Sequence, residues 1–321
     1  MQDKGPYLCF ADFEFTCGSP AHRLKSEMLS VGLVICDSEH NIIETFYCTA
    51  RPNRFPKLTS QCKRLTHLTQ SEINNSPDSE AVLERVTALM DKYSASELCV
   101  WGNFDKPGLV SDRRQHIQFR KPHHNIDAVC SAITDIQDRM VREMGLPQAV
   151  SIEELASVFG YIPSNGTFHN ALNDAEALFT IHKAVVSGEF RSSQKFAELR
   201  QERLDRMAAV KAAQEERRRE IALSYELSQE EKEYYESAVR EGRDKTVRKF
   251  IQLRSKLVNS FTRYSDENDF VMIVYDQPRR IRIMPRSRYT RQKSQGALKT
   301  EFFAREDAGR FIIRECEESL S

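Results

Sequence analysis

The sequence lacks the patterns of a secreted or membrane-spanning protein. None of its eight cysteines forms a Cys-x-x-Cys pair, and most lie in apolar stretches, which favours buried free thiols in a reducing compartment over disulfides or a zinc site. No run of residues approaches the roughly 18 apolar positions of a membrane span. The first residues, MQDKGPYLCF, lack the apolar core of a signal peptide. We therefore expect a cytoplasmic protein with no membrane segment.

The sequence also lacks a net charge, an internal repeat and a low-complexity tract. Lys plus Arg and Asp plus Glu both number 47, but they are unevenly distributed. Residues 1–190 hold 24 acids and 18 bases, whereas residues 191–321 hold 23 acids and 29 bases. This asymmetry predicts a catalytic part rich in carboxylates, joined to a part that can meet a polyanion. The length of 321 residues allows about two domains.

The N-terminal part of the chain contains short apolar runs followed by amphipathic segments. Polar residues at 37–41 separate two of the runs, which is typical of an antiparallel meander at the start of a mixed sheet. We expect strands at 8–17, 28–36, 42–48 and 98–101, and helices at 58–71, 79–93, 105–114, 128–144, 152–159 and 171–186. Strands surrounded by helices predict an α/β or α+β layered domain, which we place at residues 1–188.

Residues 189–321 predict a separate α+β accessory domain. A charged, Ala-rich segment at 196–224 indicates a long solvated helix. Ser228 and Glu231 have the spacing of a helix N-terminal capping box, so a second helix begins there. We expect the domain to contain a helical hairpin at about 195–262, then a small β-rich unit and a final helix at about 268–320.

The first apolar run carries two acids, Asp12 and Glu14, two positions apart. In a strand both carboxylates therefore point to the same face. Burying them among Leu8, Phe10 and Phe15 costs free energy unless a positive charge lies between them. A hard divalent cation such as Mg²⁺ or Mn²⁺ is the fitting partner, because it prefers oxygen ligands. The alternative is a half-buried edge strand with both acids in water.

Three further residues complete a candidate site. Asp105 ends the segment Trp-Gly-Asn-Phe-Asp just after a predicted strand, where functional residues of layered folds often lie. His169 and Asp174 are five residues apart, so a helix that begins near Asn170 turns Asp174 inward and leaves His169 on the preceding loop. A lone loop histidine is more often a surface residue. Four acids and one histidine in this order, however, form a set that rarely arises by accident.

These motifs resemble those of the DnaQ-type 3′–5′ exonucleases of the DEDDh class, a family with a ribonuclease H-like fold. Asp12 and Glu14 match the first motif of that family, Asp105 the second, and His169 with Asp174 the third. The sequence is most similar to the branch that contains the KapD sporulation inhibitor and the enhanced-RNAi-type exonucleases. The segments that carry this similarity are Phe13–Cys17, Arg51-Pro52, Leu58, Cys62, Leu65-Thr66, Leu68-Thr69 and Trp101-Gly102.

The resemblance implies a mixed sheet flanked by helices, and hydrolysis of phosphodiester bonds from the 3′ end of a nucleic acid. It implies that the four acids bind two Mg²⁺ or Mn²⁺ ions and that His169 takes a proton from the attacking water. RNA or single-stranded ends are favoured as the substrate, with DNA trimming or repair as the alternative activity. The alternative outside the enzyme class is a recruitment protein whose C-terminal domain holds the function. The four acids are Asp12, Glu14, Asp105 and Asp174.

Two sets of residues are expected to contact the nucleic acid. Phe13 and Met28 are candidates to stack on or wedge the terminal base, with core packing as the alternative. Residues 277–299 contain eight bases and no acid, so we expect this basic hairpin to track a phosphate backbone. The alternatives are a solvated surface, a docking face for a protein partner, or self-association through residues 191–321. The expected contacts are Arg279, Arg280, Arg282, Arg286, Arg288, Arg291 and Lys293.

Overall fold

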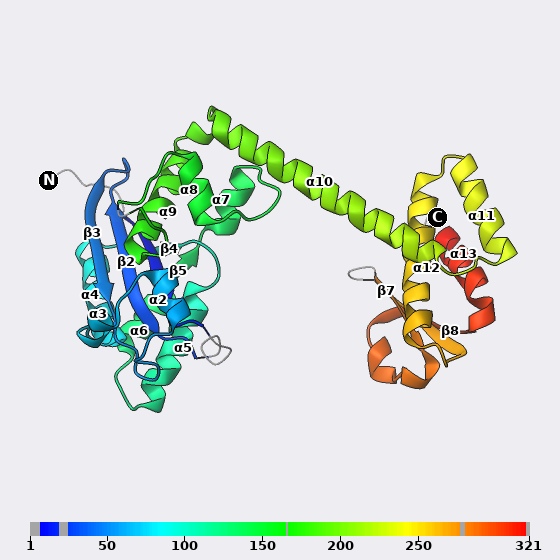
Figure 1. The fold of residues 1–321 in the computed structure, drawn as a ribbon, viewed down its shortest axis with the longest axis horizontal. Helices are drawn as coiled ribbons and strands as arrows, with labels where there is room; N and C mark the ends of the chain where they lie inside the picture. Colours follow the sequence, from blue (N-terminus) through cyan, green and yellow to red (C-terminus); the bar gives the residue numbers. More distant parts are fainter. Residues whose placement is uncertain (1–6, 19–24, 165, 277–279, 319–321) are drawn as a thin grey trace. The chain divides into compact units, whose positions relative to one another are not determined.

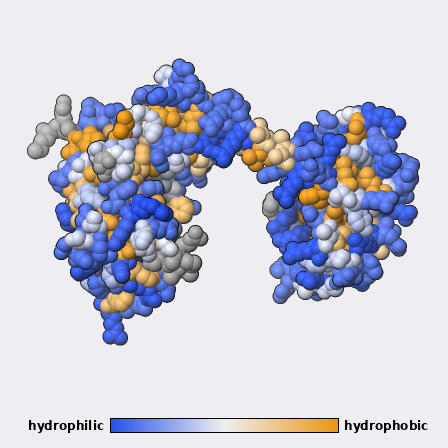
Figure 2. All heavy atoms as spheres, viewed as in Figure 1, coloured by the Kyte–Doolittle hydropathy of each residue, from blue (hydrophilic) through white to orange (hydrophobic). Residues whose placement is uncertain are grey.

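The computed structural model describes residues 7–18, 25–164, 166–276 and 280–318. The chain divides into two compact units, Met1–Asp205 and Arg206–Ser321 (Figure 1). Each unit has a hydrophobic core of its own. In the view of Figure 2, hydrophilic residues cover most of the visible surface of each unit. No helix within the described residues is long and apolar enough to cross a membrane.

The N-terminal unit is built on a five-stranded mixed sheet with the strand order β3-β2-β1-β4-β5. β1, β2 and β3 form the expected antiparallel meander, and β4 and β5 continue the sheet in parallel with β1. The predicted fold class, a ribonuclease H-like mixed sheet flanked by helices, is confirmed. The strands are β1 (Leu8–Phe15), β2 (Met28–Cys36), β3 (Ile42–Thr49), β4 (Leu98–Val100) and β5 (Ile133–Asp135).

Two helical predictions for this unit were too simple. The segment expected as one helix at 128–144 contains the short strand β5, because Ile133 leaves the helical conformation and the chain pairs with β4. The segment expected at 58–71 is two helices, separated by His67 in the left-handed conformation at φ 58°. The helices are α2 (Ser60–Thr66), α3 (Gln70–Asn74), α4 (Ser79–Lys92), α5 (Asp105–Gln118), α6 (His124–Ala132), α7 (Gln137–Glu143), α8 (Ile152–Val158) and α9 (Ala171–Val186).

Helices cover both faces of this sheet (Figure 1). Phe10 of β1 points to one face and packs in a core with residues of α7, α8 and α9. Cys9, Ala11 and Phe13 point to the other face and pack in a core with residues of α4, α5 and α6. This alternation places the even-numbered residues of β1 on the α9 side, which decides where its two acids point.

The N-terminal unit extends past residue 188. A short 3₁₀ turn, η1 (Glu189–Arg191), follows α9, and its Phe190 is buried in the core beside that helix. Phe196 and Leu199, in the first turns of α10 (Gln194–Leu223), join the same core. The compact units therefore divide at 205/206 rather than at the expected 188/189.

The C-terminal unit combines helices with a three-stranded antiparallel sheet of order β7-β6-β8. Ser228 and Glu231 form the expected capping box of α11. α12 packs against α11. The sequence predicts a hairpin between α12 and the long helix at 196–224, which corresponds to α10, so this pairing was wrong. The elements are α11 (Gln229–Arg240), α12 (Asp244–Arg263), β6 (Asp269–Tyr275), β7 (Arg280–Pro285), η2 (Arg286–Arg288), η3 (Arg291–Ser294), β8 (Ala297–Ala304), η4 (Arg305–Asp307) and α13 (Ala308–Glu318).

One face of this small sheet packs on α12 and α13, through Phe250 and Leu257 of α12 and Phe270 of β6. On the opposite face, Val271 and Ile273 form a smaller buried cluster under the segment that joins β7 to β8. All eight cysteines of the chain are free thiols, and six of them are buried. The prediction of free thiols is therefore confirmed.

Candidate active site

Strand β1 presents Asp12 and Glu14 on the face that α9 covers. Asp12 lies opposite Gly32 of β2, and Glu14 lies opposite Ser30, so both carboxylates project from the centre of the sheet. Gly32 has a steric role, because a Cβ atom there would lie 2.1 Å from the backbone oxygen of Ala171. The missing side chain lets the first turn of α9 approach the two acids.

Asp105 is the first residue of α5, directly after β4. β4 pairs in parallel with β1, with Cys99 opposite Phe10, so the chain leaves the sheet beside the middle of β1, close to Asp12. Burial raises the pKa of Asp105 to about 7, although hydrogen bonds from the backbone N–H groups of Asp105 and Phe13 act in the opposite direction. A helix N-terminus also favours a carboxylate, which helps to hold this acid in a site that is 6% exposed.

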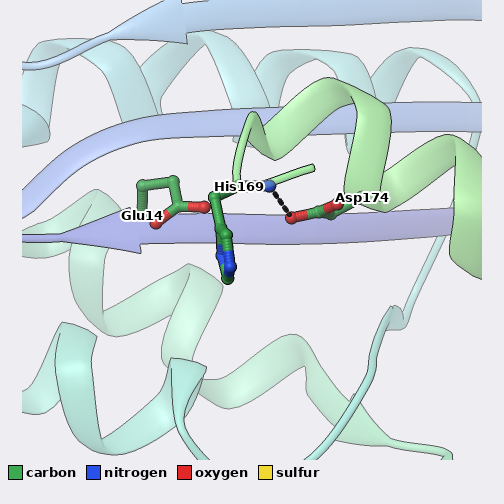
Figure 3. Close-up of side chains that lie close together, drawn as sticks. All are labelled: Glu14, His169 and Asp174. Carbon is green, nitrogen blue, oxygen red and sulfur yellow. Dashed lines mark hydrogen bonds between the residues drawn. The ribbon is translucent and has the colours of Figure 1, made fainter. Parts of the chain in front are cut away.

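Asp174 lies in the first turn of α9, which Asn170 caps by accepting hydrogen bonds from the backbone N–H groups of Leu172 and Asn173. The carboxylate of Asp174 accepts a hydrogen bond from the backbone N–H of His169, at 3.0 Å (Figure 3). Its second oxygen, Oδ1, is buried and has no hydrogen-bond partner among the described residues. A buried carboxylate oxygen without a partner is a natural ligand for a cation.

His169 reaches the site from a loop in an unusual backbone conformation. Its φ is +61°, in the left-handed region that residues other than glycine rarely adopt. Its imidazole is exposed and lies beside Glu14 in Figure 3. One ligand atom from each of Glu14, His169 and Asp174 lies within 4.8 Å of the others. The loop therefore brings a group that can accept a proton next to the carboxylates.

The four acids share one electrostatic environment. Burial raises the pKa of Asp12 well above its ordinary value, and the charges of Asp105, Glu14 and Asp174 raise it further. Burial and the charges of Asp174 and Asp105 raise the pKa of Glu14 in the same way. The pKa of Asp174 is raised to about 7, mainly by burial. Four oxygen-rich groups that repel one another fit hard divalent cations, which would compensate all of these charges.

A buried glutamate fixes the loop that ends β1. Glu27 is fully buried, and its carboxylate accepts hydrogen bonds from the backbone N–H groups of Asn53, Arg54 and Phe55. Its own backbone oxygen accepts a hydrogen bond from Thr16, at 2.9 Å. This network ties the end of β1 to the start of β2 and so supports the position of Glu14. This network cannot be recognised in the sequence, because all of these hydrogen bonds are donated by main-chain N–H groups.

The two expected aromatic or apolar contacts to the substrate base are corrected. Phe13 is 5% exposed and Met28 is fully buried, both in the core on the far face of the sheet from the acids. Phe13 lies on the far face because side chains alternate along a strand, and its neighbours Asp12 and Glu14 face α9. The expected basic contacts lie in the C-terminal unit, where Arg280, Arg282, Arg286, Arg288, Arg291 and Lys293 are exposed. Arg279 lies outside the described residues.

Phe104 is a further candidate for contact with a substrate base, at a position that the sequence pattern does not single out. It directly precedes Asp105, and 83% of it is exposed, an unusual exposure for an aromatic side chain. A pocket of about 470 Å³ lies in the same region, between residues of the β4–α5 junction and Ile133 and Asp135. The signal in the sequence is an aromatic residue directly before an acid that follows a strand.

Comparisons with known proteins match the part of the chain that contains this candidate site. The sequence model of the exonuclease family RNase_T matches residues 9–182. The probable 3′-5′ exonuclease KapD of Bacillus subtilis (strain 168) is 26% identical over 181 residues, which are 56% of this chain and 83% of that protein. The 3′-5′ exonuclease eri1 of Schizosaccharomyces pombe (strain 972) is 30% identical over 90 residues, which are 27% of this chain and 30% of that protein.

Among solved structures, the nuclease domain of 3′hExo, described as a DEDDh family member bound to rAMP, is similar to this chain with a TM-score of 0.46. It is 21% identical, and the match covers 58% of this chain and 94% of that one. The family match ends at residue 182, inside the N-terminal unit. The C-terminal unit therefore lies outside the region that the family model describes.

Proposed function

Because this chain belongs to the exonuclease family RNase_T, we propose that it is a metal-dependent 3′–5′ exonuclease that removes nucleotides from the 3′ end of a nucleic acid. The observation that carries the proposal is the convergence of Asp12, Glu14, Asp105 and Asp174 with the exposed His169. A single-stranded or RNA 3′ end is the favoured substrate. Removal of nucleotides from DNA is the alternative within the same chemistry.

The four acids are the proposed ligands of two Mg²⁺ or Mn²⁺ ions. The unpartnered oxygen of Asp174 and the raised pKa values of the four carboxyl groups support this assignment. When bound, such ions lower the pKa of a water molecule and stabilise the charge on the phosphoryl group and the leaving oxygen. The chain itself contributes the orientation of the ligands, through Gly32 and through the hydrogen bond from His169 to Asp174.

His169 is the proposed general base. A neutral imidazole can accept a proton from a water molecule. A ring nitrogen of His169 lies within 4.8 Å of carboxylate oxygens of Glu14 and Asp174, two of the proposed metal ligands. Phe104 is the proposed contact for the terminal base, in place of Phe13 and Met28. Stacking on an exposed aromatic ring contributes about 1–3 kcal/mol per base and tolerates any base. Its exposure of 83% beside Asp105 supports this role.

The test is cleavage of 5′-labelled single-stranded RNA and DNA of one sequence, in Mg²⁺, Mn²⁺ and EDTA. We expect a ladder that shortens from the 3′ end, requires the metal and is lost in Asp174→Asn. Asp91→Asn, which makes the same chemical change at an exposed position of α4, is the matched control and should cleave like the parent. A folded parent protein that shortens neither substrate in either metal would refute the proposal.

The same variant has a second expected outcome, in stability. Asp174→Asn removes one of four mutually repelling carboxylates and keeps an amide oxygen that can still accept the hydrogen bond from His169. We therefore expect its melting temperature in EDTA to equal or exceed that of the parent. A melting temperature well below the parent would mean that Asp174 supports the fold, so that lost activity would say little about catalysis.

A further inference from the structure

We propose that the C-terminal unit carries a second nucleic-acid-binding site, a groove between α12 and the edge strand β7 that holds the phosphate backbone of a single-stranded segment. The groove has a volume of about 420 Å³. Its polar and charged lining consists of Lys256, Asn259, Ser260, Arg263, Tyr264 and Arg282. The nature of the ligand rests on the proposed exonuclease function, whereas the groove itself is a property of this unit alone.

The charge of the groove has one sign. Lys256, Arg263 and Arg282 line it, and none of its lining residues is an acid. Burial lowers the pKa of Lys256, and the nearby charges of Lys249 and Arg218 lower it further. Bringing so many bases together is unfavourable without an anion, so a row of phosphates would relieve their mutual repulsion.

Aromatic rings hold the neighbouring guanidinium groups in place. Arg280 and Arg282 lie over the ring of Tyr275, at 4.7 Å and 5.8 Å from its centre. Arg263 and Arg288 lie over the ring of Tyr264, at 5.5 Å and 4.8 Å. A guanidinium that lies over a ring keeps its N–H groups free at the edge, where a phosphate oxygen can accept from them.

The arginines that lie over these two rings can still bind an anion. Within the described part of the chain, no ion pair joins an acid to Arg263, Arg280, Arg282 or Arg288. The acids nearest in sequence, Asp266, Glu267 and Asp269, lie where β6 begins, and none of them lines the groove. Arg280 pairs with Tyr275, the last residue of β6, whereas these acids lie at its start. Arg280 and Arg282 are therefore at the end of β7 that is farther from the acids. Positive charge held on rigid aromatic supports is typical of surfaces that bind single strands.

The edge of β7 is poorly suited to bind a different kind of ligand, an added peptide strand. β7 is at the edge of its sheet, so its outward backbone groups could pair with a strand from another protein. Two of its carbonyl oxygens are already engaged by α12, however. Lys256 donates to the oxygen of Ile281 at 3.1 Å, and Ser260 donates to the oxygen of Ile283 at 3.5 Å. This favours a ligand recognised by charge over one recognised by main-chain pairing.

Binding is the first test, and it uses the full chain with Asp12→Asn to prevent cleavage. Fluorescence anisotropy would follow a labelled 20-nucleotide RNA over a range of KCl concentrations. We expect Arg263→Gln/Arg282→Gln, which changes two residues that line the groove, to weaken binding by about tenfold at low salt. It should also reduce the slope of log K against log salt by roughly 1.4, for two lost phosphate contacts. The matched control is Lys232→Gln/Arg240→Gln, which removes two exposed charges from α11 and should bind like the parent.

Cleavage by the chain without Asp12→Asn separates this proposal from the proposed function. We expect the double arginine variant to cleave a 4-nucleotide substrate at the parent rate and a 20-nucleotide substrate more slowly, through a higher KM. If the parent cleaves neither substrate, the exonuclease proposal fails and the binding result still decides the groove. Equal binding of RNA by the parent and the arginine variant overturns the groove. The proposal also fails if the parent binds polyglutamate but not RNA, and if the arginine variant no longer binds polyglutamate. That result would assign the surface to an acidic protein.

Discussion

At the scale of single residues, the site combines several features that lower the stability of the folded chain. Asp105 and Asp174 are nearly buried, and their pKa values of about 7 mean that ionising them in the folded chain is costly. His169 adds a backbone conformation that costs of order 1–3 kcal/mol for a residue other than glycine. Unfavourable features that gather at one place, on an otherwise regular fold, are typical of a catalytic site.

The proposed proton transfer by His169 predicts the outcome of His169→Asn. Asparagine tolerates the left-handed backbone at φ +61°, so the loop and its hydrogen bond to Asp174 should persist. Asparagine cannot take a proton near neutral pH, so we expect kcat to fall at least about 100-fold with little change in melting temperature. Single-turnover cleavage of the labelled RNA measures this loss.

The control for this variant is His124→Asn, at an exposed histidine of α6. It should leave the rate of cleavage unchanged. If His169→Asn kept a rate within a few-fold of the parent, the general base would have to be another group, and His169 would be a positioning residue only.

The sequence was sufficient to predict that the four acids lie close together, but not which side chains around them are exposed. Acids two apart in a strand, or directly after one, are placed by backbone geometry alone, so Asp12 and Asp105 could be proposed from spacing. Exposure depends on packing from distant parts of the chain, which spacing does not contain. This is why Phe13 was assigned to the substrate while it lies in the core, and why Phe104 was passed over.

At the scale of elements, the site depends on how closely α9 lies on the sheet. Gly32 meets the backbone of Ala171 and Leu172, and no side chain separates the strand from the helix there. Backbone atoms cannot move aside as a flexible side chain can. The distance between the acids of β1 and Asp174 is therefore set by the absence of one methyl group.

Gly32→Ala should accordingly damage both stability and activity. The new Cβ would lie 2.1 Å from the oxygen of Ala171, so α9 must shift away from β2. We expect a loss of about 1–3 kcal/mol in the free energy of unfolding, typical of an overpacked core, and a larger loss of cleavage than of stability. Urea denaturation and cleavage assays on the same preparation measure the two effects. Thr45→Ala, at an exposed position of β3, should change neither, and an unaffected Gly32→Ala would show that α9 can adjust without cost.

The contact between α9 and the β2–β3 turn should make stability depend on pH. His182 of α9 is hydrogen-bonded to His40 at 3.2 Å, and burial lowers its pKa to about 4, with the nearby charges of His40 and Arg139 acting in the same direction. Between pH 6.5 and 4 the unfolded chain binds a proton at this residue and the folded chain does not. Stability should therefore fall as the pH is lowered through this range.

His182→Gln isolates this contribution, because glutamine keeps a polar side chain but does not titrate. From pH 7 to pH 5 we expect the parent to lose about 2 kcal/mol more of its free energy of unfolding than the variant. The loss comes from the range between pH 6.5 and pH 5, in which His182 is protonated in the unfolded chain but not in the folded one. Urea denaturation at the two pH values gives the comparison. Parallel losses in the two proteins would mean that His182 is protonated as easily in the folded chain as in the unfolded one.

Elements with strong local signals were predictable, and those that depend on partners were not. The expected helix at 171–186 coincides with α9, since a capping residue precedes it and apolar positions recur along it. β5 has only three residues, so its own sequence carries little signal and it forms because β4 is available to pair with. The partner of α12 was likewise misassigned, because an apolar stripe does not identify which helix will cover it.

At the scale of the whole molecule, each unit is stabilised by its own core, and the C-terminal unit adds a buried ion pair. Arg254 of α12 is 2% exposed and binds Glu231 of α11. Arg254 also donates to the backbone oxygens of Ala222 at 2.9 Å and Glu226 at 2.8 Å, which end α10 and lead into α11. On the other side, Gly309 of α13 leaves just enough room for the Glu231 side chain. One pair of charges thus connects the end of α10 with α11, α12 and α13.

Removing Arg254 should therefore destabilise the C-terminal unit and spare the chemistry of the other. Arg254→Met leaves the buried Glu231 carboxylate without its ion-pair partner, although the hydrogen bond from the backbone N–H of Ser228 remains. It also removes the donor to the backbone oxygens of Ala222, Tyr225 and Glu226, and breaking such a buried pair typically costs about 3–5 kcal/mol. We expect amide hydrogen exchange to rise in α11, α12 and α13 but not in β1 and β2, and cleavage of a 4-nucleotide substrate to be unchanged. Arg240→Met, at an exposed position of α11, should alter neither measurement. Faster exchange in β1 together with loss of cleavage would mean that the two units depend on one another for their stability, and that the core of the nuclease unit does not suffice for the catalytic site.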